Sequence, residues 1–326
     1  MAIDIGKTVK KIHPVEFIAK YSIYFITLIL VIVCSLLTDR FFTAPNMLNI
    51  LRQISIYAMI AFAESVLLIS GNLDLSAGSI VALTGCTSVQ VYLATGNNLF
   101  IALLFAILIG VTASLVNGII TVSCKLPSFI VTMATQKAYR GMVYLITGGM
   151  VISLPAGSNF RTLGQGYVGP IPRPIIIMLL LGVILYVIMD WTRLGRNFYA
   201  LGGNREAARA SGINLSKYTL FAFVLAGVFA GFAGIVFASR TNSGIPTGAV
   251  GFEGEGIAAA VIGGVGFAGG SGSAWGAIIG AFVVGVFSNI LNLLGVNPYI
   301  QEIITGAIIV TAVAMDTWTR SRRVSR

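Results

Sequence analysis

Residues 191–218 read WTRLGRNFYALGGNREAARASGINLSKY, a basic, glycine-punctuated segment set between two long apolar runs. Its charged side chains require water. The flanking runs, 172–190 and 216–238, each approach the roughly 20 apolar residues that a helix needs to cross a bilayer. A chain that keeps such a segment between two membrane crossings is expected to use it to contact a soluble partner.

The composition indicates that lipid is the solvent for most of the chain. Of its 326 residues, 56% are hydrophobic and only 10% are charged, and the mean hydropathy is +0.92. A soluble domain carries about 25% charged residues. Strands in lipid require a closed barrel with strict alternation, which these runs lack. The sequence therefore predicts an all-α integral membrane protein, and its 38 glycines suit close helix packing.

About ten transmembrane helices are predicted, some of them short or broken. The expected spans are 19–37, 48–70, 78–94, 99–123, 127–147, 172–190, 216–238, 255–270, 273–295 and 298–316. The third and the eighth are short and rich in glycine. The first run could instead belong to a signal peptide, but it is long for one and no small-residue cleavage site follows it. An uncleaved helix is therefore expected there.

Lysine and arginine predict the orientation, because basic loops remain on the cytoplasmic side. The N-terminal tail, the loop with Lys125, the segment 191–217 and the C-terminal tail are basic. Both termini and this coupling segment are therefore expected in the cytoplasm. The opposite side then holds three loops: 39–46, 240–250 and a long external loop, 148–171. The net charge of +10 thus reflects orientation, nucleic acid is not an expected partner, and residues 1–326 are expected to form a single transmembrane domain.

The residue types present argue against most catalytic and cofactor chemistry. His13 is the sole histidine, and the three cysteines show no metal-binding spacing. The cysteines are Cys34, Cys86 and Cys124. Residues 6–8, Gly-Lys-Thr, are similar to the end of a P-loop, but the first glycine of that motif and a preceding strand are missing. We therefore expect no catalytic residue, no metal and no cofactor in this chain, and any ATPase must be another polypeptide.

Residues 204–211, NREAARAS, predict a short helix inside the basic segment. Asn204 suits the N-cap, Glu206 suits the first turn, and Gly212 suits the position after the last turn. The alternative is an ordinary solvated loop between two membrane helices.

Several stretches of this sequence carry a family resemblance. The runs LGRNFYALGGNREAARASGI at 194–213 and GNLDLSAGS at 71–79 closely resemble the ribose-type ABC importer permeases, members of the family of sugar and branched-chain amino-acid permeases. Three further stretches agree with it, in the family's order: LPSFIVTMATQKAYRG at 126–141, GIAAAVIGGVGFAGGSG at 256–272 and NLLGVNPYIQEII at 292–304. The resemblance covers nearly the whole chain.

The resemblance implies the permease subunit of an ATP-driven importer in the bacterial inner membrane, which takes up a monosaccharide or a similar small polar solute. Its implied partners are a second permease chain, identical or different, an ABC ATPase subunit that holds ATP and Mg, and an extracytoplasmic solute-binding protein. In that family the segment between the sixth and seventh helices docks on the ATPase. The residues that would carry this role here are Gly203, Asn204, Glu206, Ala207, Ala208, Ser211 and Gly212.

The chain departs from the family pattern at two places. The family usually has Gly-Ile-Asp-Leu-Ser where residues 71–76 read Gly-Asn-Leu-Asp-Leu-Ser, and it often has Glu-Leu-Asp where residues 253–256 read Glu-Gly-Glu-Gly. Both departures keep an acid and small residues. They leave the identity of the solute open.

Polar residues inside the apolar runs are candidates for a translocation path, because charge at membrane depth is costly unless it faces a cavity or a partner. On the fifth span Ser128, Thr132, Gln136 and Arg140 recur every fourth residue and share one side of a helix. Hydrogen bonding between helices, with Arg140 snorkelling outward, is the alternative. The candidate path residues are Glu64, Asp74, Ser76, Thr132, Gln136, Arg140, Glu253, Glu255, Asn289 and Asn292. The tyrosines that could supply aromatic faces to a sugar are Tyr57, Tyr139 and Tyr144.

Two of these acids allow more than one interpretation. Asp74, in a glycine-rich break between spans, either lines the path or caps the next helix from a water-exposed loop. Glu64, deep in the second span, either lines the path or pairs with Arg140 or Lys137, since pairing is the common fate of buried ions.

An alternative function is an ion-gradient-driven secondary carrier with Glu64 or Asp74 as its proton site. The missing histidines and catalytic motifs argue against an intramembrane enzyme. Close helix crossings are predicted at the GxxxG pairs 227–231, 266–270 and 276–280.

Overall fold

The structure, a computed structural model, describes residues 14–324. The tails that carry His13, the Gly-Lys-Thr run at 6–8 and Arg326 lie outside the described residues. The longer helices are α1 (Pro14–Leu37), α2 (Ala44–Ile69), α3 (Ala77–Ala94), α4 (Leu99–Ser123), α5 (Ser128–Thr147), α7 (Arg173–Tyr186), α10 (Leu215–Thr241), α12 (Ala274–Leu293) and α13 (Pro298–Val324). The shorter ones are η1 (Asn159–Arg161), α6 (Thr162–Gln165), the π-helical turn η2 (Val187–Trp191), α8 (Arg193–Gly203), α9 (Arg205–Ala210) and α11 (Phe252–Ile262).

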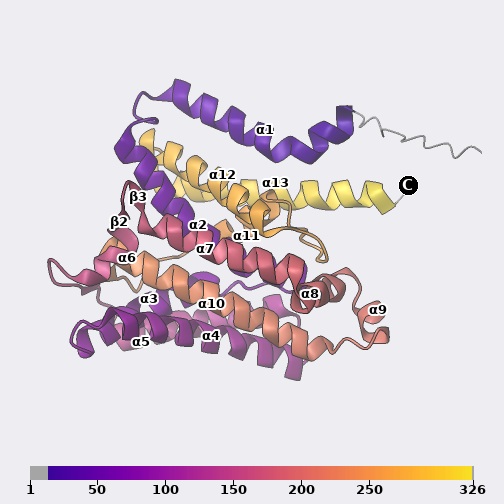
Figure 1. The fold of residues 1–326 in the computed structure, drawn as a ribbon, viewed down its shortest axis with the longest axis horizontal. Coiled ribbons are helices and arrows are strands. Elements are labelled where there is room, and N and C mark those ends of the chain that lie inside the picture. The colour runs from indigo at the N-terminus through magenta and orange to yellow at the C-terminus, as the bar shows by residue number, and fades with distance from the viewer. Residues whose placement is uncertain (1–13, 325–326) are drawn as a thin grey trace, which may run out of the picture.

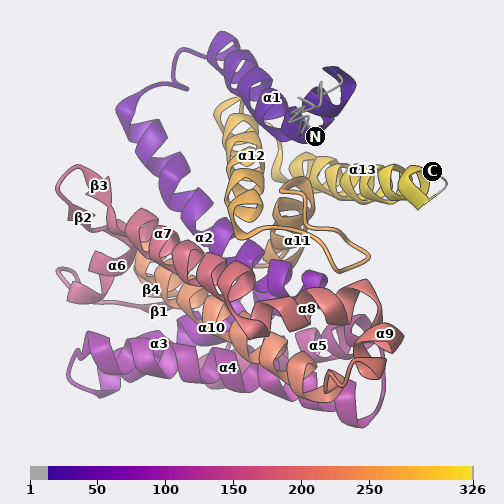
Figure 2. The same cartoon turned by 45° about the vertical axis from the view of Figure 1, so that its right-hand side comes forward.

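The helices pack in three layers, which can be followed in Figures 1 and 2. The central layer holds α2, α7 and α10, with α3, α4 and α5 on one side and α1, α11, α12 and α13 on the other. Among the described residues, six helices are long and apolar enough to cross a membrane. The helix α2 is buried almost throughout its second half, where all residues except Glu64 and Ser65 are apolar or aromatic.

Large apolar side chains cover the outside of the bundle. Leu36 on α1 and Leu145 on α5 are 81% and 85% exposed, and the outer faces of α4 and α7 are similarly apolar. Soluble proteins rarely expose such extensive apolar surface. The observed architecture is therefore that of a mostly helical, multi-pass membrane protein.

A helix lies at every predicted span, but the prediction for 255–270 is wrong in part. The helix α11 ends at Ile262, and the chain continues through the loop 263–273, where glycines at 264, 269, 270 and 272 adopt positive φ. A helix cannot continue through such conformations. The GxxxG pair 266–270 consequently lies in this loop and forms no helix crossing.

The other two GxxxG pairs do mark close crossings. A Cβ atom on Gly227 would lie 2.5 Å from the carbonyl oxygen of Gly110, where α10 crosses α4. A Cβ atom on Gly280 would lie 1.8 Å from the carbonyl oxygen of Ala259, where α12 crosses α11. Glycine thus allows these backbones to touch, as in other membrane helix pairs.

The two ends of the bundle differ. At one, which we call the strand end, β1 (Ile152–Ser153) pairs antiparallel with β4 (Ser243–Gly244), and β2 (Tyr167–Val168) pairs with β3 (Ile171–Pro172). The pairing of β1 with β4 joins two loops that were predicted to share one side. The opposite end, which we call the α9 end, holds α8, α9, the start of α1 and the end of α13 (Figure 1).

Candidate functional site

The glycine-rich break between α2 and α3 folds back into the bundle. After Gly71, whose φ is +74°, the backbone N–H of Asn72 donates to the Leu67 carbonyl at 2.8 Å, and that of Asp74 lies 3.5 Å from Glu64 Oε2. Glu64 lies five residues before the end of α2, about 7.5 Å along the axis at the rise of an α-helix. The helix α3 therefore begins inside the bundle, and the predicted break is confirmed.

The helix α5 holds this break in place. Ser128 Oγ accepts from the backbone N–H of Leu73 at 2.9 Å, and Thr132 Oγ1 accepts from that of Leu75 at 3.0 Å. Buried backbone donors must find partners, and these two hydroxyls supply them. This part of the polar face of α5 thus bonds to neighbouring backbone.

A continuous series of buried hydrogen bonds, which we call the central polar chain, runs from Glu64 through Asp74, Ser76 and Asn117 to Tyr139. Asp74 Oδ1 accepts from the backbone N–H and the hydroxyl of Ser76, at 2.7 and 2.5 Å. The Asn117 amide donates to Ser76 Oγ at 2.8 Å, and the Tyr139 hydroxyl donates to Asn117 Oδ1 at 2.9 Å. The chain links the α2–α3 break to α4 and α5.

Asp74 lies inside the protein, beside the start of α3. It is 3% exposed, so the expectation of a water-exposed capping loop is wrong. It accepts from the backbone N–H of Ser76, the residue just before α3, and so makes a local turn contact at the start of the helix. The Ser76 side chain donates to Asp74 and does not cap the helix itself.

The suggested pairing of Glu64 with Arg140 or Lys137 is also wrong. Glu64 is fully buried, and its Oε1 has no hydrogen-bond partner among the described residues. Arg140 Nη1 instead donates to the carbonyls of Pro246 and Gly248, at 2.7 and 2.8 Å. Arg140 therefore does not snorkel outward but holds the segment that precedes α11.

The first turns of α3 and α11 meet in the centre of the bundle. A Cβ atom on Gly78 would lie 2.1 Å from Glu253 Oε2 and 2.4 Å from the Ala249 carbonyl oxygen. Gln136 donates to Glu253 Oε1 at 2.9 Å, while Glu253 Oε2 has no hydrogen-bond partner among the described residues. Acids near helix N-termini are electrostatically favoured. The N-terminal ends of α3 and α11 thus place Asp74 and Glu253 in the same central region.

The structure gathers most of the predicted path residues here. The gathered residues are Glu64, Asp74, Ser76, Thr132, Gln136, Arg140 and Glu253. Glu255 instead lines an apolar groove between α11, α12 and α13, and Asn289 and Asn292 line a cavity at the strand end. Asn117 was missed as a site residue, although a lone asparagine in the apolar run 99–123 was a usable signal.

A cavity of about 890 Å³ opens at the α9 end and reaches the α2–α3 break. Its lining includes Asn72 and Leu75 from the break and the basic residues Lys125, Arg205 and Arg209. The basic loop with Lys125 and the coupling segment therefore share one end of the bundle, as the orientation argument requires.

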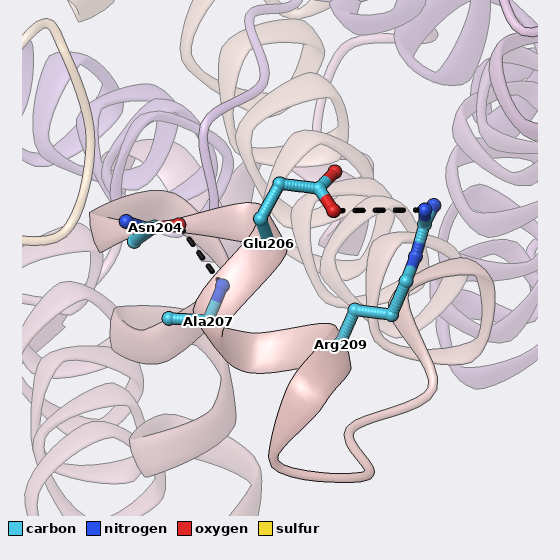
Figure 3. Close-up of polar contacts among 4 residues, drawn as sticks. All are labelled: Asn204, Glu206, Ala207 and Arg209. Carbon is cyan, nitrogen blue, oxygen red and sulfur yellow. Dashed lines mark hydrogen bonds and ion pairs between the residues drawn. The ribbon is translucent and has the colours of Figure 1, made fainter.

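The predicted short helix at 204–211 is confirmed as α9 (Figure 3). Asn204 Oδ1 accepts from the backbone N–H of Ala207 at 3.0 Å, which makes Asn204 the N-cap. The exposed Glu206 and Arg209 side chains approach to 3.8 Å. Gly212 follows the helix with φ +80°. Apart from Ala208, which is 4% exposed, the residues of α9 are exposed at the surface.

The end of α8 is locked against the centre of the protein. A Cβ atom on Gly202 would lie 1.9 Å from the Ile69 carbonyl oxygen, and Gly270 donates to that same carbonyl at 2.9 Å. The Tyr199 hydroxyl donates to the Gly272 carbonyl at 2.9 Å. The end of α8 thus contacts both the end of α2 and the loop after α11, the two elements that lead into the central region.

Comparisons with known proteins agree with one another. The family model described as branched-chain amino acid transport system / permease component matches residues 46–313. The ribose import permease protein RbsC of Haemophilus influenzae is 35% identical over 312 residues, which cover 95% of this chain and 96% of that protein. The D-allose permease AlsC and the L-arabinose permease AraH of Escherichia coli K12 are 34% and 33% identical, over 91% and 92% of this chain and 91% and 90% of their own lengths. No solved structure matches the chain significantly.

Proposed function

We propose that this chain, which belongs to the family of branched-chain amino acid transport system permease components, is the membrane-spanning permease subunit of an ATP-driven ABC importer. The match to ribose, allose and arabinose permeases over nine-tenths of the chain carries this proposal and supports a monosaccharide or a similar small polar solute. Those relatives are bacterial, which supports the bacterial inner membrane as its location.

In this proposal the α9 end faces the cytoplasm, with both termini, and the strand end faces outward. A separate ATPase subunit, which holds ATP and Mg, docks on residues 203–212. A soluble binding protein delivers the solute to the strand end, and a second permease chain, identical or different, completes the path. The chain itself makes and breaks no covalent bond in the solute, so it is not an enzyme.

The contacts of α8 suggest how force would travel. A push on α9 is transmitted by α8 to the Ile69 carbonyl, which Gly270 shares and which Gly202 touches. Ile69 precedes the α2–α3 break, and Gly270 follows α11. A small displacement of the end of α8 therefore reaches both α3 and α11. The close contacts around Gly78 favour two discrete arrangements of these helices over gradual deformation.

Glu64 Oε1 has no hydrogen-bond partner in the described part of the chain and lies close to Asp74, which favours one alternative, a carrier driven by a proton gradient. Uptake into membrane vesicles distinguishes the two. With the membrane potential and the pH gradient collapsed and ATP supplied at the cytoplasmic face, we expect uptake to continue. Uptake that needs the gradients and ignores ATP would establish the carrier instead.

Changes in α9 should uncouple ATP hydrolysis from transport. Glu206→Ala and Gly212→Val leave the membrane helices untouched, so the protein should insert normally. Loss of one strong interface contact costs about 1.4 kcal/mol or more, so uptake should fall by about tenfold or more. Glu302→Ala, an exposed acid at the strand end, is the matched control. Wild-type uptake by both α9 variants would show that the ATPase docks elsewhere.

A further inference from the structure

A second polar cavity opens at the strand end, apart from the central polar chain. It measures about 340 Å³, within the range of about 300–1,000 Å³ that small-molecule sites occupy. Its polar lining comes from α2, α10 and α12 and consists of Asn49, Gln53, Tyr57, Arg240, Asn289 and Asn292. We call this cavity the amide pocket.

The amide pocket has an open polar rim and a buried floor. Asn49 and Asn292 are exposed at the rim, whereas Tyr57 and Asn289 are 7% and 3% exposed. The Tyr57 ring packs edge-on against Phe252, with centroids 5.3 Å apart. Small-molecule sites combine apolar or aromatic surface with polar groups that fix the orientation of the ligand, and both kinds of group line this pocket.

Internal hydrogen bonds orient the polar groups and leave some of them free. Arg240 Nη2 donates to Asn49 Oδ1 at 2.9 Å, and Gln53 Nε2 donates to the Tyr57 hydroxyl at 3.0 Å. No contact among the described residues engages the Gln53 carbonyl oxygen or the Asn49 NH₂ group. An amide supplies two donors and an acceptor, so the pocket offers both kinds of group to a ligand.

The charge of the lining restricts the class of ligand. Among the described residues that line the pocket, Arg240 is the one charged residue, and none is Asp or Glu. The ammonium group of an amino acid would lack a carboxylate partner, and a buried unpaired charge is costly. Arg240 is held by the Asn49 amide oxygen, and its guanidinium has further N–H groups that can donate to a ligand. Hydroxyl groups, which donate and accept, fit this mixture.

We propose that the amide pocket is the outer binding site for the transported solute, and that it takes a neutral, polyhydroxylated molecule of monosaccharide size held by Gln53 and Asn49. This inference rests on the proposed function, because it assumes that the strand end is where solute enters. The pocket ends at Phe252 in the first turn of α11. The adjacent Glu253 belongs to the central region, so a solute in the pocket lies beside the element that leads inward.

Saturation-transfer NMR on the full chain in lipid nanodiscs tests the inference, with D-ribose, D-allose and L-arabinose as probes. We expect transfer to at least one sugar from the wild-type chain, and none to L-leucine. Gln53→Leu and the exposed rim variant Asn49→Ala should each bind that sugar roughly three- to tenfold more weakly, the effect of losing one ligand hydrogen bond. Gln90→Leu is the matched control, because Gln90 is an equally half-buried amide that donates outside the pocket, to the Ile146 carbonyl.

The outcomes separate this inference from the proposed function. The inference is overturned if the wild-type chain binds none of the sugars, if both pocket variants bind like the wild type, or if D-gluconate, an acid of similar size, binds more tightly than the sugars. ATP-dependent uptake in vesicles would still stand in each of those cases. Loss of ATP-dependent uptake in the wild type would instead remove the proposed function.

Discussion

Gly202→Ala should lower solute uptake by about fivefold or more while the protein still inserts in the membrane. The added Cβ atom would lie 1.9 Å from the Ile69 carbonyl oxygen and 2.7 Å from the Gly270 nitrogen. Both are backbone atoms that cannot rotate away, so the end of α8 must separate from α2 and from the loop after α11. Overpacking of this kind costs about 1–3 kcal/mol. If that free energy is lost from the coupling between α9 and the central region, uptake falls roughly 5- to 150-fold.

The measurement is uptake and ATP hydrolysis by the reconstituted complex. We expect hydrolysis to persist while uptake falls, because the docking surface of α9 remains exposed. Gly306→Ala is the control, since a Cβ atom on Gly306 has no neighbour within 4 Å. Normal uptake by the Gly202 variant would mean that force does not pass through the end of α8.

The positions of the helices could be read from the sequence, whereas the limits of α11 could not. The apolar runs and the Asn204 and Gly212 signals predict the helices and α9, since burial and capping are local properties. In contrast, 255–270 is apolar apart from Glu255, and the residues of the loop after α11 are as apolar as those of a helix. The glycines that end α11 resemble those that permit helix crossings elsewhere in this chain, so composition alone does not separate the two uses.

The sequence shows which polar residues lie inside the apolar runs, but it predicts their hydrogen-bond partners less well. The four-residue spacing correctly places Thr132 and Gln136 on an inward face of α5. The partner of Arg140 is not an acid but the backbone of Pro246 and Gly248, more than 100 residues later. Sequence spacing does not show where a distant loop will bring its carbonyls. Sequence spacing also does not show how far along the bundle a residue lies, and this position separates Asn289, at the strand end, from the central region.

Gly227→Leu should prevent the chain from reaching its folded state. At this position α10, the helix that follows the coupling segment, crosses α4, the helix that carries Asn117. A Cβ atom would lie 2.5 Å from the Gly110 carbonyl oxygen and 2.7 Å from the Val111 Cα, so the two backbones would have to move apart. That separation would also remove the close approach of Gly231 to Ile107, and with it much of the contact between the helices.

Thermal unfolding in detergent, followed by size-exclusion chromatography, measures this effect. We expect the Gly227→Leu chain to aggregate or to unfold well below the wild type, by the several kcal/mol typical of large core disruptions. Gly141→Leu places the same side chain on α5, where a Cβ atom has no neighbour within 4 Å, and should unfold like the wild type. Equal stability of the two variants would mean that α4 and α10 are not in backbone contact. The position of Asn117 against the α2–α3 break depends on that contact.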